Sequence, residues 1–378
     1  MQKNPIGYIF FFLGCFLILA CQRDRKDLVS YASMDTLSVS SKIFDHPFEI
    51  PINRTSLNYV RLETGLHPTI THIDQLKIYL NTIFILDRST SSLTFFDITG
   101  KFIKSITIKN TSLQYFDILD NEIYLLDRNQ SKLFKFNLQG KLLKTIHQDF
   151  HGVQFAALPG DKFIYNTCGL ITRDGESEKY QLSMPGLKKA DMQLPFKPIY
   201  SGIKYLFENQ FSRNGSQVFF TSAFENVIYK IDTTKITALT KFDFGNYNMP
   251  DSIFLKGKAF DNFNAFPYVS DLVNVANNSR FSFFKFSYNN RQGYVLSDSK
   301  RKKVIAGGID VVADEASDFN NSIPVCSYGD KFVAVVSPKD WLKMSSELDL
   351  SSTKLNKKYP MQSIKGSDAP ILLFYTLL

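Results

Sequence analysis

An internal repeat constrains the fold of this chain more than any other feature of its sequence. Residues 81–106 recur as residues 121–146 in a register of 40 residues without a gap, and 12 of the 26 aligned positions are identical. A repeat of this period is typical of architectures in which one supersecondary unit is stacked several times. The chain is therefore expected to contain further copies of the same unit.

Each copy predicts a four-stranded antiparallel meander. Short apolar or alternating runs rich in Ile, Leu, Phe and Tyr are separated by Asp-Asn, Arg-Asn-Gln-Ser and Gln-Gly, which are hairpin-type turn residues. Four strands within about 40 residues are typical of a propeller blade. One blade leaves its faces and edges open, so the pattern must continue until a ring closes. In the second copy the predicted strands are 113–119, 122–127, 132–138 and 141–146.

The same rhythm continues along the chain, although the repeat itself decays after the second copy. The predicted class is therefore all-β, a six-bladed β-propeller of four-stranded antiparallel blades. Seven blades remain an alternative, because the 40-residue register favours seven and the visible insertions favour six. A short helix is also predicted over 251–258, and an amphipathic helix over 341–350 within an insertion at 338–367. The predicted blades are 73–106, 113–146, 153–200, 217–245, 281–307 and a sixth made from 323–336 and 369–378.

Two runs at opposite ends of the chain predict how the ring closes. Residues 57–64 alternate like a half-buried strand but precede the first blade, so they lack a neighbouring strand in the sequence. The closing run, 369–378, is apolar and must be buried. We expect it to be a middle strand of the sixth blade, with 57–64 completing that blade from the outside.

The N-terminus predicts a lipoprotein signal peptide over residues 1–20. Lys3 is followed by an uncharged apolar run over 6–20, and the sequence Ile-Leu-Ala-Cys at 18–21 resembles a bacterial lipobox, with Leu19 bulkier than usual. The apolar run is shorter than the ~20 residues that span a bilayer. Cleavage before Cys21 and lipid attachment to Cys21 are therefore expected. Residues 21–55 would form a lipidated tether and lead-in, and 56–378 the propeller.

Lipidation predicts a place in the cell envelope and a first partner, the membrane. No acidic run of the kind that resembles surface-export signals follows Cys21, which favours the periplasmic side of the outer membrane. The formal net charge is +8. For an exported protein this excess favours anionic headgroups or acidic glycans over nucleic acid. The basic run at 300–303 lies between two predicted strands and is expected at an exposed turn.

The cysteines give little evidence of chemistry. Cys15 would leave with the signal peptide and Cys21 would be acylated, so Cys168 and Cys326 remain, without a C-x-x-C motif. An oxidising compartment allows a disulfide between them. Two separate buried strand cysteines are the favoured interpretation.

The candidate binding residues are the pairs Asp87-Arg88 and Asp127-Arg128, which occupy the same position in the two copies. One interpretation is a set of ligand-facing charges. The other is a structural turn in which the carboxylate accepts backbone N–H groups. Recurrence in successive blades favours the turn.

No catalytic or metal motif is present. His147 and His151 are four apart, but in a strand end and loop rather than on a helix face, so no metal site is predicted. A divalent metal in the channel is left open, and no other cofactor is expected. Asp-Thr-Leu at 35–37, Asp-Thr-Thr at 232–234 and Asp-Ser-Ile at 251–253 resemble a short O-glycosylation triplet. They make Thr36, Thr233 and Ser252 candidate acceptors.

The lipobox cysteine, the paired copies at 81–106 and 121–146, the strand at 226–232 and the closing apolar strand together resemble the six-bladed β-propeller lipoproteins of Gram-negative bacteria. The chain is similar, more loosely, to NHL-repeat propellers, which act mainly as binding platforms. The resemblance covers nearly the whole mature chain and favours six blades. The lipoprotein family is largely without assigned function, so the resemblance implies a fold rather than an activity.

The leading hypothesis is a membrane-anchored platform that binds a ligand, an envelope protein or a glycan without catalysis. One alternative is a propeller enzyme, a lyase or metal-dependent hydrolase with its site at the central channel. Such enzymes assemble sites from single residues of different blades, and a cluster of Glu, Asp, Asn or His at the channel would favour this alternative. The other alternative is a structural subunit of an envelope assembly, which would require an exposed apolar patch.

Overall fold

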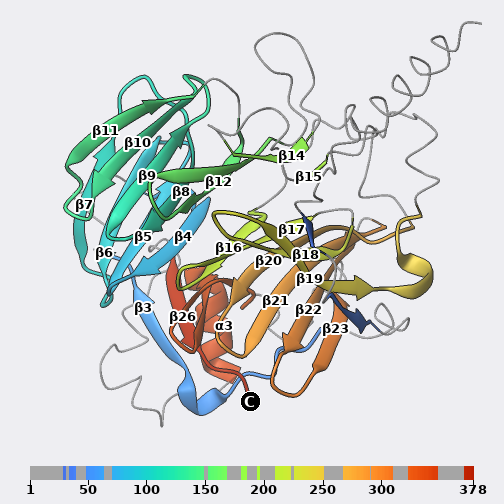
Figure 1. The fold of residues 1–378 in the computed structure, drawn as a ribbon. Helices are drawn as coiled ribbons and strands as arrows, with labels where there is room; N and C mark the ends of the chain where they lie inside the picture. Colours follow the sequence, from blue (N-terminus) through green and yellow to red (C-terminus); the bar gives the residue numbers. More distant parts are fainter. Residues whose placement is uncertain are drawn as a thin grey trace, which may run out of the picture.

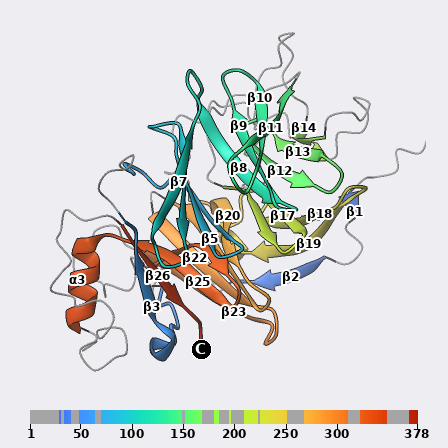
Figure 2. The same ribbon diagram turned by 90° about the vertical axis from the view of Figure 1, so that its left-hand side faces the viewer.

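In the computed structural model the chain is a six-bladed β-propeller (Figures 1 and 2). Every blade contains a four-stranded antiparallel sheet, which confirms the predicted fold class and settles the blade number at six. The structure describes residues 29–30, 34–39, 48–63, 70–148, 152–167, 180–184, 194–195, 209–222, 225–250, 267–289, 291–309, 322–347 and 370–378.

The first three blades follow one another in the sequence, and each runs from its first strand to its last without a crossover. The first blade contains β4 (Gln75–Tyr79), β5 (Thr82–Asp87), β6 (Ser92–Asp97) and β7 (Phe102–Thr107), the second β8 (Leu113–Leu119), β9 (Glu122–Asp127), β10 (Lys132–Asn137) and β11 (Leu142–His147), and the third β12 (Gln154–Leu158), β13 (Lys162–Asn166), β14 (Tyr180–Ser183) and β15 (Leu194–Pro195).

The other three blades keep this order, with additions at the fourth and the sixth. The fourth contains β16 (Phe211–Asn214), β17 (Gln217–Ser222), β18 (Val227–Ile231) and β19 (Ile236–Asp243), and the short strands β1 (Val29–Ser30) and β2 (Asp35–Ser38) pair in parallel with β19. The fifth contains β20 (Ser270–Asn277), β21 (Phe281–Tyr288), β22 (Arg291–Asp298) and β23 (Lys303–Ile309), and the sixth β24 (Pro324–Tyr328), β25 (Lys331–Val336), β26 (Ile371–Tyr375) and β3 (Asn58–Arg61).

The sixth blade closes the ring as the sequence predicted. The C-terminal strand β26 lies between β25 and the N-terminal strand β3, which completes the blade at its outer edge. Beyond the sheet, the N–H of Asn53 donates to the carbonyl of Thr376 at 2.9 Å. Both ends of the propeller therefore belong to one sheet, which closes the ring.

The first strand of each blade lies on the inside of the ring. We call these six strands the inner strands: β4, β8, β12, β16, β20 and β24. Several connect to the second strand of the blade through a two-residue turn. In the first two blades these turns are Leu80-Asn81 and Asp120-Asn121, and all four residues have positive φ. Asn and Asp tolerate this conformation, and such turns match the twist of an antiparallel pair.

The core lies between the blades and is rich in aromatic rings. Phe84 and Phe95 of the first blade, with ring centroids 4.8 Å apart, pack in one cluster with Phe116 and Ile118 of the second. Phe242 of the fourth blade similarly contacts a ring of the fifth. The aromatic excess of the sequence therefore fills the wedges between sheets.

The described part of the insertion contains one helix, α3 (Pro338–Glu347), which lies beside β3 and β26 in Figure 2. It begins three residues earlier than predicted, because the Ser337 hydroxyl accepts from the N–H of Asp340 and donates to its carboxylate, which forms an N-terminal cap. Trp341 is buried, with its ring centroid 4.5 Å from that of Tyr59. No helix in the described ranges is long and apolar enough to cross a membrane.

Two predictions of the strand pattern were incomplete. The inner strands β16 and β20 were not expected, because β16 contains a single buried apolar residue, Phe211, and β20 lies in a stretch that interrupts the rhythm. The helix predicted at 251–258 lies outside the described residues. The basic run at 300–303 is exposed at the turn between β22 and β23, as predicted.

Candidate functional site

A cavity of about 580 Å³ occupies one end of the ring. Five of the six inner strands line it, and it includes several turns that join the first and second strands of a blade. Ligand pockets are commonly concave sites of this size where several elements converge. The lining residues are 75–79, 117–120, 209, 211–216, 275–277 and 325–329.

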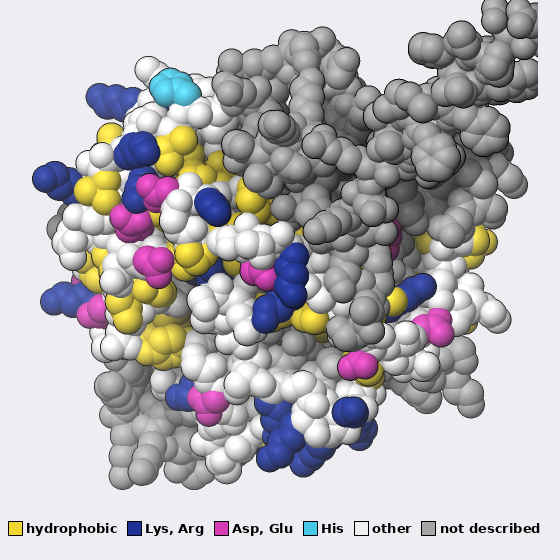
Figure 3. Space-filling model, in the orientation of Figure 1, with side chains coloured by type: hydrophobic (Ala, Val, Ile, Leu, Met, Phe, Trp, Pro, Cys, Tyr) yellow, Lys and Arg dark blue, Asp and Glu magenta, His cyan; other side chains and the backbone are white. Residues whose placement is uncertain are grey.

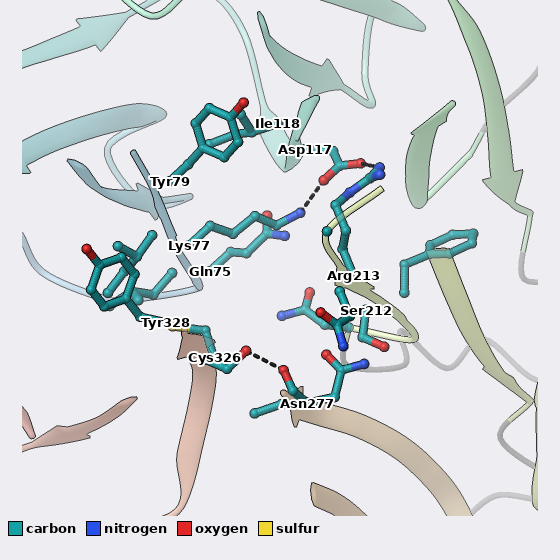
Figure 4. A pocket seen from close by; sticks show the side chains of 18 of the residues that line it. Gln75, Lys77, Tyr79, Asp117, Ile118, Ser212, Arg213, Asn277, Cys326 and Tyr328 are labelled. Atoms are coloured by element: carbon teal, nitrogen blue, oxygen red, sulfur yellow. Dashed lines mark hydrogen bonds and ion pairs between the residues drawn. The ribbon is translucent and has the colours of Figure 1, made fainter. Parts of the chain in front are cut away.

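Three charged side chains from three different blades meet at this cavity (Figure 4). Lys77 donates from Nζ to Oδ1 of Asp117 at 2.6 Å, and Arg213 donates from Nη2 to Oδ2 of the same carboxylate at 2.6 Å. The Asp117 side chain is 3% exposed, against 25% for Lys77 and 17% for Arg213. We call these three residues the charged cluster.

The third blade supplies the remaining hydrogen bond to the Asp117 carboxylate. The N–H of Ala157 donates to Oδ2 of Asp117 at 2.9 Å, and the carbonyl of Ala157 accepts from Nη2 of Arg213 at 2.6 Å. The carboxylate therefore accepts three hydrogen bonds from three blades. A buried charge is tolerated only when it is paired and hydrogen-bonded in this way.

The environment shifts the pKa of both partners in the first ion pair. Burial favours the neutral form of Asp117, but the adjacent Arg213 and Lys77 outweigh it and hold the pKa of this carboxyl well below its usual range. Burial lowers the pKa of Lys77, against the opposing attraction of Asp117. Asp117 is therefore a firmly ionised acceptor.

One segment of the cavity wall contains several buried polar atoms without a hydrogen-bond partner in the described structure. They are Oδ1 of Asn209, Oγ of Ser212, and Nε and Nη1 of Arg213. A buried polar atom without a partner costs free energy, so such atoms are few in native proteins. Four such atoms therefore lie on one short segment of the cavity wall.

Two tyrosines of the cavity lining form hydrogen bonds with asparagines in the turns of neighbouring blades. The Tyr79 hydroxyl donates to Oδ1 of Asn121, a turn residue of the next blade, at 3.1 Å. The Tyr328 hydroxyl makes the equivalent contact with Asn81, from the sixth blade to the first. The same Tyr-to-Asn bridge therefore joins two successive pairs of blades and holds two aromatic rings in the cavity lining.

Cys326 also lines the cavity, on β24. It is a free cysteine at a partly buried position, and burial of its thiol raises the thiol pKa, although Lys77 opposes this effect. A raised pKa leaves little thiolate at neutral pH, which makes this cysteine a poor nucleophile. Cys168, the other candidate for a disulfide, lies outside the described residues.

The residues predicted from the sequence lie elsewhere. Asp87 and Asp127 are buried at the turns between second and third strands. Since adjacent strands are antiparallel, these turns lie at the end of each blade opposite to the cavity. Neither the two aspartates nor Arg88 and Arg128 line it.

Both aspartates make the hydrogen bonds of a structural turn. Asp87 accepts from the N–H and hydroxyl of Thr71, both at 2.8 Å, and from the N–H of Ser89 at 2.9 Å. Burial opposes ionisation, but these bonds lower the pKa of Asp87 below its usual range. Asp127 accepts from the N–H of Asn129 at 3.0 Å.

The basic partners of these turns differ. Arg88 donates from Nε to the carbonyl of Gln114 at 3.0 Å, in the next blade. The backbone N–H of Arg128 donates to the carbonyl of Ser112 at 3.3 Å. The structure thus gives the turns a packing role, and a ligand-binding role for the four residues stays a prediction.

The remaining predicted positions are scattered. Thr36 is exposed on β2, and Thr233 is partly exposed in the turn before β19. Cys21 and Ser252 lie outside the described residues, as does His151, whereas His147 is exposed at the end of β11. Within the described ranges no group of three His, Cys, Asp or Glu side chains could hold a metal ion.

The charged cluster was missed, although a signal for part of it was present in the sequence. Lys77 and Asp117 are 40 residues apart, as are Asp117 and Ala157, so the repeat register places all three at one position of successive inner strands. Opposite charges at equivalent positions of adjacent blades indicate a cross-blade pair. Arg213 carries no such signal, because the repeat has decayed by the fourth blade.

A solved structure shows the same fold, and others are more distantly similar. A protein from Bacteroides fragilis NCTC 9343, described as exported, matches with a TM-score of 0.70 and 16% identity, over 92% of this chain and 100% of that one. A member of the DUF4221 family from Bacteroides vulgatus ATCC 8482 has a TM-score of 0.49 and 11% identity, over 87% and 98% of the two chains. Virginiamycin B lyase from Staphylococcus aureus has a TM-score of 0.38 and 11% identity, over 68% and 75%. The last two similarities support no inference about this chain.

Sequence comparison identifies the family. A search of curated proteins found no significant match. A family model described as "Domain of unknown function (DUF4934)" matches residues 54–376, which include nearly the whole propeller. The chain belongs to the DUF4934 family.

Proposed function

We propose that this protein is a lipid-anchored β-propeller of the cell envelope that binds a small ligand in the cavity at the inner-strand turns, without catalysis. The observation that carries the proposal is the convergence of five inner strands on one cavity of about 580 Å³ that has charged and polar side chains in its wall. Buried polar atoms of Asn209, Ser212 and Arg213 in its wall have no partner within the described structure. A polar ligand in the cavity would lie against this segment of the wall.

The chemistry of the lining supports binding over reaction. Asp117 is the buried carboxylate of the cavity, and its lowered pKa makes it a weak base. Its oxygens already accept hydrogen bonds from Lys77, Arg213 and Ala157. Cys326 has a raised thiol pKa, which disfavours nucleophilic attack. These groups suit recognition of a ligand by fixed charges and dipoles.

The N-terminus supports a place at the membrane. Cys21 follows an apolar run in a sequence that resembles a lipobox, and acyl chains on this residue would hold the propeller at the envelope. The B. fragilis protein with the same fold is described as exported, which agrees with this location. In Figure 3, basic side chains are interspersed with acidic and apolar ones over the described part of one face.

A blocked cavity tests the binding proposal. Val325 is 40% exposed and lines the cavity, so Val325→Trp should fill the mouth without disturbing the core. Leu142→Trp, at a 49% exposed position on the outer strand β11, is the matched control. The full chain, purified in detergent, is screened by thermal shift against a library of metabolites and envelope saccharides.

Compounds that stabilise the wild type and Leu142→Trp, but not Val325→Trp, are the expected result. A library without any such compound would overturn the proposal. The anchor is tested separately by labelling cells with a radioactive fatty acid. We expect label on the wild type and none on Cys21→Ser, and equal labelling of both would overturn lipid attachment at Cys21.

A further inference from the structure

The charged cluster has an imbalance that no other buried residue of the described cavity lining corrects. It brings two cations, Lys77 and Arg213, onto the single carboxylate of Asp117. The other acidic residue in the lining, Asp120, is exposed at the turn after β8. The inner part of the cavity therefore has one more positive than negative charge, at partly or fully buried positions.

Both cations also retain unused hydrogen-bond donors. An ammonium group has three donors and a guanidinium five. Asp117 is the one hydrogen-bond acceptor of Lys77 in the described structure, and Nε and Nη1 of Arg213 have none. Lys77 is the more accessible of the two, since a quarter of its side chain is exposed and its Nζ lies at the cavity wall in Figure 4.

We propose that the cavity recognises a ligand through an oxyanion, a carboxylate or a phosphate ester, that pairs with Lys77 beside Arg213. This inference rests on the proposed ligand-binding function and specifies the chemistry of the ligand. An oxyanion would balance the excess charge and accept the remaining Lys77 donors, and hydrogen bonds between charged groups are the strong ones. The rings of Tyr79 and Tyr328 and the amide of Asn277 in the same lining suit a neutral polar body attached to that anion.

Four probes test the inference on the full chain in detergent: glucose, glucuronate, glucose 6-phosphate and inorganic phosphate. The three sugars share one ring and differ in the group at carbon 6, so they separate the anion from the body that carries it. Binding is measured by calorimetry and thermal shift at constant ionic strength with chloride as the balancing ion. We expect at least one anionic sugar to bind about tenfold or more tightly than glucose, because a charged hydrogen bond contributes that much.

Two substitutions with opposite expected effects separate recognition from damage to the fold. Lys77→Gln removes the accessible cation and should weaken the best anion about tenfold or more. Asp117→Asn removes the internal competitor and should strengthen the same anion. Lys141→Gln, at an exposed position in the turn before β11, should leave binding unchanged. Circular dichroism tests whether each variant is folded. If Lys77→Gln does not fold, the direction in which Asp117→Asn changes anion affinity decides whether the inference holds.

Each outcome has a distinct meaning. Tighter binding of glucuronate identifies the preferred anion as a carboxylate, and tighter binding of glucose 6-phosphate identifies it as a phosphate ester. Equal binding of glucose and the anions, or anion binding unaffected by Lys77→Gln, overturns the inference and leaves the proposed cavity function standing. No binding by any of the four probes also overturns it, whereas the screen with Val325→Trp decides the cavity function independently.

Discussion

Lys77 and Asp117 occupy the same position of two successive inner strands, and Nζ of the first lies 2.6 Å from Oδ1 of the second. They are 40 residues apart, which is the register of the repeat. Equivalent positions of neighbouring blades face the same channel. Because the two copies differ here, with Lys in one and Asp in the other, the two side chains form a charge pair. Arg213, from the fourth blade, then adds the second cation.

Removal of the central carboxylate should destabilise the propeller strongly. Asp117→Asn leaves Lys77 and Arg213 close together without their shared anion, and breaking a buried ion pair in this way costs about 3 to 5 kcal/mol. Urea unfolding measures the loss. Asp330→Asn, at an exposed turn residue outside the cavity, is the matched control and should change stability by less than about 0.5 kcal/mol. Equal effects of the two changes would contradict a structural role for the charged cluster.

The lowered pKa of Asp117 predicts acid sensitivity. Its usual value is 3.8, and Arg213 and Lys77 hold it lower in the folded protein, despite burial. The unfolded chain therefore binds the proton more readily, so the stabilisation is fully present above pH 3.8 and is lost as the pH falls toward the folded pKa. The stability difference between wild type and Asp117→Asn should shrink as the pH falls from 5 to 3. This range spans roughly the pKa at which the Asp117 carboxyl group of the unfolded chain takes up its proton. A difference that stays constant over this range would contradict the shift.

The two turn aspartates should differ in their contribution to stability. Asp87 accepts bonds of 2.8 Å from the N–H and hydroxyl of Thr71, whereas Asp127 has one buried oxygen, Oδ2, without a partner in the described structure. Hydrogen bonds to a charged group contribute about 1.5 to 3 kcal/mol. Asp87→Ala should therefore cost about 2 kcal/mol, and Asp127→Ala less.

Both turn variants should leave cavity ligands unaffected, because these turns lie at the opposite end of the blades. Stability is measured by urea unfolding, and ligand binding by thermal shift. Loss of ligand binding in a folded Asp87→Ala variant would instead support the binding role predicted from the sequence.

The thiol of Cys326 should react slowly. Burial raises its pKa, so the reactive thiolate is scarce at pH 7. Iodoacetamide labelling, followed by peptide mass spectrometry so that each cysteine is measured separately, should be much slower for the folded chain than for the chain in urea. Lys77 opposes the rise in pKa, so Lys77→Gln should slow the reaction further. Rapid labelling of Cys326 in the folded wild type would contradict this account.

Local patterns in the sequence were sufficient for the architecture. The repeated strands, the Asn-containing turns and the apolar closing run each depend on interactions within one blade or between adjacent strands. They predicted an all-β ring and its closure by β3 and β26, which the structure confirms. They left six and seven blades open, and the resemblance to six-bladed lipoproteins favoured six, which the structure also confirms. The inner strand β16 was missed because its sequence, Phe-Ser-Arg-Asn, lacks the apolar alternation on which such predictions depend.

Apart from the 40-residue spacing of Lys77, Asp117 and Ala157, the candidate site follows no local pattern and depends on contacts between blades. Asp117 and Arg213 are 96 residues apart, and Tyr328 reaches Asn81 across 247 residues. No period in the sequence relates these pairs, because the two side chains of each pair belong to different blades that meet only in the assembled ring. The blade is encoded by neighbours in the chain, whereas the cavity and its charge depend on contacts between strands that only the closed ring places side by side.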